Sequence, residues 1–186
     1  MSKLKSILSD KSNRFVMLMA LVYISWKLLY SYLSESTGVV NQVWLGTVNY
    51  LSFYYTAISA SLLQLLGEQT VQQGNKIHFI IHNSNITVGE HCLAIPAMYI
   101  FTFSILLFPG SLKNKAWFIP IGLVGVALIN VARIVLLSIV FVHFPGKYFI
   151  FHHVVLFVAI TYSLILLLVF IWMKYWSELT PQNPDK

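Results

Sequence analysis

Residues 117–142, WFIPIGLVGVALINVARIVLLSIVFV, decide the fold class of this chain. The run is apolar almost throughout, and its only charged side chain is Arg133. A helix needs roughly 20 mostly apolar residues to cross about 30 Å of hydrocarbon at about 1.5 Å per residue. The run therefore predicts a membrane-spanning helix that carries a charge within it.

The whole composition points the same way. Of 186 residues, 58% are hydrophobic and 10% are charged, and the mean hydropathy is +0.74. Soluble domains average about 25% charged residues. Further apolar runs occupy residues 15–33, 93–108 and 154–173. Together they predict an all-α integral membrane protein, a bundle of roughly four to six transmembrane helices.

Two stretches do not resemble clean spans. Residues 38–67 mix apolar and aromatic residues with Asn, Gln, Ser and Thr, which favours an amphipathic helix in the membrane interface or a re-entrant pair. Residues 68–91 are the most polar part of the chain. Within them, β-branched and aromatic residues at 76–82 and 86–88 flank an Asn-rich turn, which predicts a small two-stranded β-hairpin outside the membrane.

The basic residues predict the topology. If residues 38–67 stay on one side, the N-terminus, the 113–115 loop and the C-terminal tail share the cytoplasmic side. That side then holds Lys3, Lys5, Lys11, Arg14, Lys113, Lys115, Lys174 and Lys186, whereas the other holds only Lys76 and Lys147. We expect a cytoplasmic N-terminus (1–14), one transmembrane catalytic module (15–175) and a polar tail (176–186). The formal net charge of +6 is spread along the chain, so we expect it to meet lipid head groups and no nucleic acid.

Candidate catalytic residues converge on the outer face under this topology. Cys92 lies where the hairpin enters the third apolar run, and Asn130 and Arg133 share one helix face. His152 and His153 precede the last run. An arginine inside a span costs at least a few kcal/mol and usually marks a functional path. Nearby cations or a helix N-terminus favour the reactive thiolate of a cysteine, a histidine can protonate a leaving amine, and an arginine can stabilise an oxyanion.

The order of these residues resembles the exosortase/archaeosortase family of membrane cysteine transpeptidases, over roughly residues 45–175. The matching words are Leu62-Leu63-Gln64-Leu65-Leu66-Gly67, Glu90-His91-Cys92-Leu93-Ala94-Ile95, Asn130-Val131-Ala132-Arg133-Ile134-Val135 and Phe151-His152-His153. Each word is weak alone, and the ordered set carries the resemblance. Leu93 and Ala94 depart from it, because many members have Ser, Thr or Asn followed by Gly there.

The resemblance implies a bacterial inner-membrane enzyme whose site faces the extracytoplasmic side. Such an enzyme recognises a C-terminal sorting signal on exported proteins, consisting of a short motif, a transmembrane helix and a basic tail. It cleaves near that signal and passes the acyl group to an acceptor, without a cofactor or metal. Carried over by position, Cys92 is the nucleophile, Arg133 the stabilising residue and His153 the proton donor, with His152 as the alternative.

Other interpretations of the same residues stay open. Arg133 and Asn130 can line the polar path of a non-enzymatic transporter subunit, and an assembly factor can keep such a fold without catalysis. A haem or metal protein using His143, His152 or His153 fits less well, because these histidines lie in loops and at helix ends. Four further histidines, His78, His82, His91 and His143, are alternatives for the catalytic one.

Overall fold

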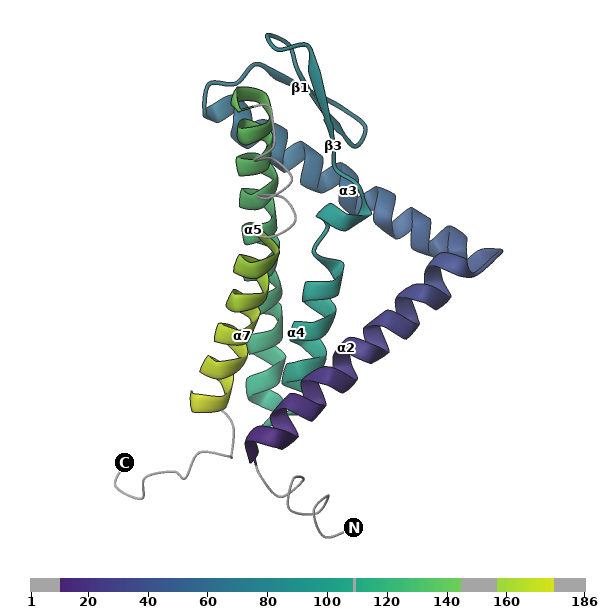
Figure 1. The fold of residues 1–186 in the computed structure, drawn as a ribbon, viewed down its shortest axis with the longest axis vertical. Helices are drawn as coiled ribbons and strands as arrows, with labels where there is room; N and C mark the ends of the chain where they lie inside the picture. Colours follow the sequence, from purple (N-terminus) through teal and green to yellow (C-terminus); the bar gives the residue numbers. More distant parts are fainter. Residues whose placement is uncertain (1–10, 109, 145–156, 176–186) are drawn as a thin grey trace.

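The protein is a set of α-helices with a small sheet at one end. The computed structural model describes residues 11–108, 110–144 and 157–175. The elements are α2 (Lys11–Glu35), α3 (Val39–Leu65), β1 (Thr70–Gln73), β2 (Lys76–Phe79), β3 (Ser84–Thr87), the 3-10 turn η1 (Glu90–Cys92), α4 (Ile95–Leu107), α5 (Leu112–His143) and α7 (Phe157–Tyr175). Helices α4, α5 and α7 pack together, and α2 packs on α4 (Figure 1).

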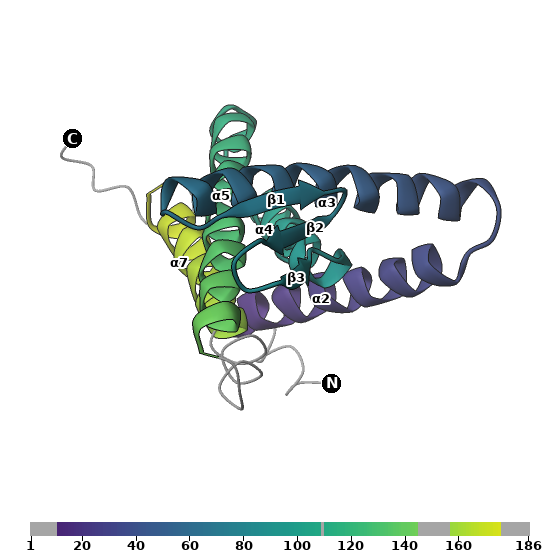
Figure 2. The same cartoon turned by 90° about the horizontal axis from the view of Figure 1, so that it is seen from above.

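The two ends of the molecule differ. The beginning of α2, the beginning of α5 and the end of α7 lie at one end, and the sheet and the end of α5 lie at the other (Figure 1). Seen from above, the sheet covers the bundle, while α2 and α3 run out beyond it to their shared turn (Figure 2). The sheet thus lies at the opposite end of the described structure from the beginning of α2.

Two of the described helices are long and apolar enough to cross a membrane, α2 over Met17–Glu35 and α5 over Leu112–His143. This favours membrane association, but it falls short of the four to six spans expected from the sequence. Helix α4 has 13 residues and is therefore only about 20 Å long. The helix begins only at Ile95, because the backbone of the preceding residue, Ala94, is left-handed. It ends at Leu107, two residues before the Pro109-Gly110 pair in the sequence. For α7, residues 154–156 of the expected span lie outside the described residues.

One of the two predictions for residues 38–67, the re-entrant pair, is wrong. Residues 39–65 form a single continuous helix of 27 residues, α3. The helix crosses the sheet end of the bundle at a steep angle to α5 (Figure 1). Its buried face includes the small polar residues Ser52, Thr56 and Ser59. Small residues let helix backbones approach closely, and α3 packs on both α5 and β1.

The sheet has three antiparallel strands in the order β1-β2-β3, one more than expected. The predicted hairpin is β2 and β3, which pair Ile77 with Ile86. The added strand, β1, has the sequence TVQQ and lies in the polar stretch before the predicted hairpin. It is held by contacts with α3 that no local pattern reveals, such as the 3.1 Å hydrogen bond from Gln72 Nε2 to the Phe53 carbonyl. Ile77 and Phe79 of β2 are fully buried.

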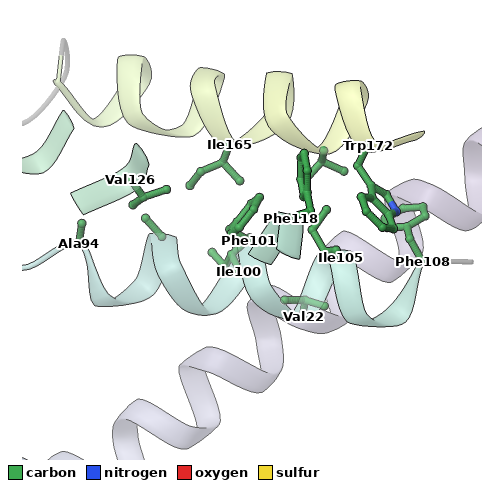
Figure 3. Close-up of a cluster of buried hydrophobic side chains, with 12 residues drawn as sticks. Val22, Ala94, Ile100, Phe101, Ile105, Phe108, Phe118, Val126, Ile165 and Trp172 are labelled. Carbon is green, nitrogen blue, oxygen red and sulfur yellow. The ribbon is translucent and has the colours of Figure 1, made fainter. Parts of the chain in front are cut away.

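The main core lies between α4, α5 and α7 (Figure 3). The Phe118 ring lies 6.0 Å from that of Phe101 and 5.1 Å from that of Trp172, measured between ring centroids. Gly122 lies directly against this stack, and a Cβ atom there would overlap the Phe101 ring. The missing side chain therefore sets how closely α4 approaches α5.

Candidate active site

Cys92 lies at the end of the 3-10 turn η1, three residues before the first residue of α4, rather than opening that helix as expected. The turn is closed by hydrogen bonds from the Cys92 amide to the Gly89 carbonyl (2.9 Å) and from the Leu93 amide to the Glu90 carbonyl (3.1 Å). Ala94 then adopts φ 53° and ψ 21°, in the left-handed region. The left-handed Ala94 therefore separates the turn that carries Cys92 from the first turn of α4.

Asn130 connects α5 to this turn. Its side-chain Nδ2 donates a 2.6 Å hydrogen bond to the Cys92 carbonyl, and the residue is 2% exposed. Its side chain also acts on the hydroxyl of Tyr55 on α3. Burial raises the pKa of Tyr55 above its ordinary value, and the Asn130 interaction opposes that rise. Asn130 therefore joins three separate elements, and sequence reasoning had not singled out Tyr55.

Arg133 lies beside the cysteine. Cys92 and Arg133 line the same cavity of about 100 Å³, together with Ile86, Thr87 and Val88 around β3 and Ile134 and Leu137 of α5. A water molecule's share of liquid volume is about 30 Å³, so this cavity has room for only a few atoms. The buried Nε atom of Arg133 has no hydrogen-bond partner among the described residues. Cys92 and Arg133 thus share a small, mainly apolar cavity, and one guanidinium donor of Arg133 is unsatisfied among the described residues.

The histidine of the predicted site cannot be placed, because His152 and His153 lie outside the described residues. The histidines that the structure does describe, His78, His82, His91 and His143, do not line the cavity of Cys92 and Arg133. His78 Nδ1 instead lies 2.6 Å from the side-chain oxygen of Asn85 on the neighbouring strand. The described alternatives for the catalytic histidine therefore do not reach the cavity, and the assignment of His153 or His152 stays a prediction.

A second cavity of about 150 Å³ is lined in part by the first two residues of η1, and the sequence did not indicate it. Its lining residues are Trp26, Lys27, Tyr30, Trp44, Glu90, His91, Ile95 and Pro96. The Oε1 atom of Glu90 is buried and has no hydrogen-bond partner within the described part of the chain. Aromatic and charged side chains from α2, α3 and η1 thus meet two residues away from the cysteine.

Comparison with known proteins adds no relative. No protein-family model matches this chain, and no curated protein or solved structure matches it either.

Proposed function

We propose that this chain is a membrane cysteine transpeptidase of the exosortase type. It would cleave exported proteins at a C-terminal sorting signal and transfer the acyl group to an acceptor. The observation that carries the proposal is the cavity lined by both Cys92 and Arg133. The two residues are far apart in the sequence. A cation near a cysteine favours its thiolate, and an arginine can stabilise the oxyanion of acyl transfer.

The reaction would run in two steps. The Cys92 thiolate attacks the carbonyl carbon of the scissile peptide bond, and the free Nε donor of Arg133 stabilises the oxyanion that develops. When the C–N bond breaks, His153, or His152 in its place, donates a proton to the leaving amine. The thioester that remains is then attacked by a nucleophile of the acceptor. The histidine, now neutral, accepts the proton of that nucleophile, and the Cys92 thiolate leaves as the transfer is completed.

Asn130 would act as a positioning residue. It does not line the cavity, but its hydrogen bond holds the Cys92 carbonyl. Because Asn130 and Arg133 are three residues apart, one face of α5 carries both the group that orients the cysteine and the group that stabilises charge. A reacting thiol must be held in position, since small displacements of a catalytic group are costly in rate.

The length of α5 supports a site near the membrane surface. The helix has 32 residues and is therefore about 48 Å long, which exceeds a hydrocarbon core of about 30 Å. If its first residue, Leu112, lies at the cytoplasmic boundary, Arg133 is about 32 Å further along and close to the outer boundary. A substrate cut at the head of its own transmembrane helix would present the scissile bond at that depth. Helices α4 and α7 would complete the bundle of four or more spans.

A processing assay in bacterial membranes tests this function. An exported protein with a C-terminal motif, transmembrane helix and basic tail is co-expressed with the wild-type chain or with Cys92→Ala, Arg133→Ala or His153→Ala. His91→Ala is the matched control, because His91 adjoins the cysteine but lies outside its cavity. We expect the first three variants to lose processing while remaining in the membrane, and the control to retain it. Unchanged processing by Cys92→Ala would overturn the proposal and favour a transporter subunit or an assembly factor.

A further inference from the structure

Three side chains with metal-binding atoms meet at the sheet end of the molecule, away from the Cys92 cavity. Glu68 follows α3, His82 lies in the turn between β2 and β3, and His143 is the last residue of α5. His143 Nε2 lies 2.8 Å from Glu68 Oε1. The rings of His82 and His143 lie edge to face, with centroids 5.3 Å apart. One ligand atom from each of the three residues falls within 4.8 Å of the other two.

We infer that Glu68, His82 and His143 bind a divalent transition-metal ion, for which Zn²⁺ has the best chemistry. Two imidazoles and one carboxylate form a known zinc ligand set, which leaves one coordination position for water. Imidazole suits Zn²⁺ and its transition-metal neighbours, whereas Ca²⁺ and Mg²⁺ require mainly oxygen ligands. The inference does not depend on the proposed transpeptidase function.

The geometry needs only a small adjustment. Ligand atoms about 2.1 Å from a tetrahedral zinc ion lie about 3.4 Å from one another. The widest separation in the cluster, up to 4.8 Å, must therefore shrink by up to about 1.4 Å. His82 is exposed in a turn, so its side chain has room to move by this amount.

A salt bridge alone accounts for less of the arrangement. That interaction needs only Glu68 and His143, and it does not account for the position of His82 beside them. A shared cation explains why all three side chains converge.

The ion would join three separate segments: the end of α3, the β2–β3 turn and the end of α5. His143 is ten residues beyond Arg133 on the same helix, about 15 Å along its axis. The ion is therefore too far away to touch the thiol. Its role would be structural, because it fixes the end of α5 against the sheet that lines the Cys92 cavity through Ile86, Thr87 and Val88.

The test uses the full chain, purified in detergent with a histidine-free affinity tag and stripped of metal with EDTA. Zn²⁺ binding is measured by calorimetry, and Co²⁺ is added separately to record its visible absorption, which reports coordination geometry. The variants are His82→Ala, His143→Ala and Glu68→Gln. His78→Ala is the matched control, because His78 lies in the same hairpin but hydrogen-bonds to Asn85. Circular dichroism checks that each variant keeps the wild-type helix content.

We expect one Zn²⁺ per chain in the wild type. His82→Ala should lower the Zn²⁺ affinity at least about tenfold, because losing even a residue that only hydrogen-bonds to a metal ligand lowers metal affinity by that factor. The control should bind as the wild type does. Zn²⁺ should also raise the melting temperature of the wild type, because a ligand that binds only the folded state stabilises it, and His82→Ala should lose this rise. Absence of stoichiometric binding, or equal binding by His82→Ala, would overturn the inference. If a variant fails to fold, the Co²⁺ spectrum of wild type decides alone: an octahedral, all-oxygen spectrum would likewise overturn it.

Discussion

The side-chain amide of Asn130 donates a 2.6 Å hydrogen bond to the main-chain carbonyl of Cys92, 38 positions earlier in the chain. The bond lies in a region that excludes water, since Asn130 is 2% exposed. A buried carbonyl without a partner costs about 1–3 kcal/mol. This one contact therefore couples the stability of the turn to the position of the cysteine in its cavity.

Replacing Asn130 with Asp should destabilise the protein by about 1–3 kcal/mol. The carboxylate has nearly the same shape, but it cannot donate to the Cys92 carbonyl and places a charge in a buried position. Thermal unfolding in detergent measures the effect. Asn49→Asp on the exposed face of α3 is the control and should change stability by less than about 0.5 kcal/mol. Equal effects of the two substitutions would show that the hydrogen bond contributes nothing.

Arg133 should increase the reactivity of the cysteine. A nearby cation favours the thiolate, which is the nucleophilic form. We expect Arg133→Ala to slow the alkylation of Cys92 by iodoacetamide several-fold at neutral pH, and Arg133→Lys to retain part of the rate. The chain has one cysteine, so the label reports a single site.

Lys113→Ala, a substitution in the first turn of α5 far from the cavity, controls for the general loss of a positive charge. Alkylation of each denatured variant controls for reagent access. Rates that are the same with and without Arg133 would contradict the assignment of this residue.

Ala94 should tolerate glycine and reject a β-branched side chain. Its left-handed backbone, with φ 53°, costs an L-residue about 1–2 kcal/mol, and glycine avoids that cost. Ala94→Gly also loses a buried methyl group worth about 0.8 kcal/mol, so we expect a net change within about 1 kcal/mol. Ala94→Val should destabilise by more than about 2 kcal/mol, since a β-branched residue is an outlier in this region. Melting temperatures of the two variants give the comparison, and similar values would refute it.

Gly122 and Gly125 offer a matched pair on one helix. A methyl group at Gly122 would overlap the Phe101 ring, whereas a methyl at Gly125 meets nothing within 4 Å. We expect Gly122→Ala to destabilise by about 1–3 kcal/mol, because overpacking forces neighbouring side chains or helices apart. Gly125→Ala should be neutral or stabilise by up to about 1 kcal/mol through its higher helix propensity. Thermal unfolding of the two variants in detergent measures the difference. A Gly122→Ala variant more stable than Gly125→Ala would contradict the close contact between Gly122 and Phe101.

The sequence patterns predicted most of the helices and two of the strands. They did not predict strand β1 or the 3-10 turn that ends at Cys92. The apolar runs predicted α2, α4, α5 and α7, and the β-branched residues predicted β2 and β3. The strand β1 was missed because its glutamines become ordered only through contacts such as that between Gln72 and Phe53 on α3. Cys92 was expected to open a helix, yet the left-handed backbone of Ala94 interrupts the chain before α4 begins.

The sequence by itself determined which residues are apolar enough for long helices, and which of these helices carries Asn130 and Arg133 on one face. Both follow from spacing along a single element. Only the tertiary structure decided that Cys92 shares a cavity with Arg133 and that Glu68 meets His143, 75 positions away. Contacts at such separations depend on how α3, the sheet and α5 pack against one another. Packing between separate elements leaves no periodic pattern in the sequence, so these contacts could not be predicted from it.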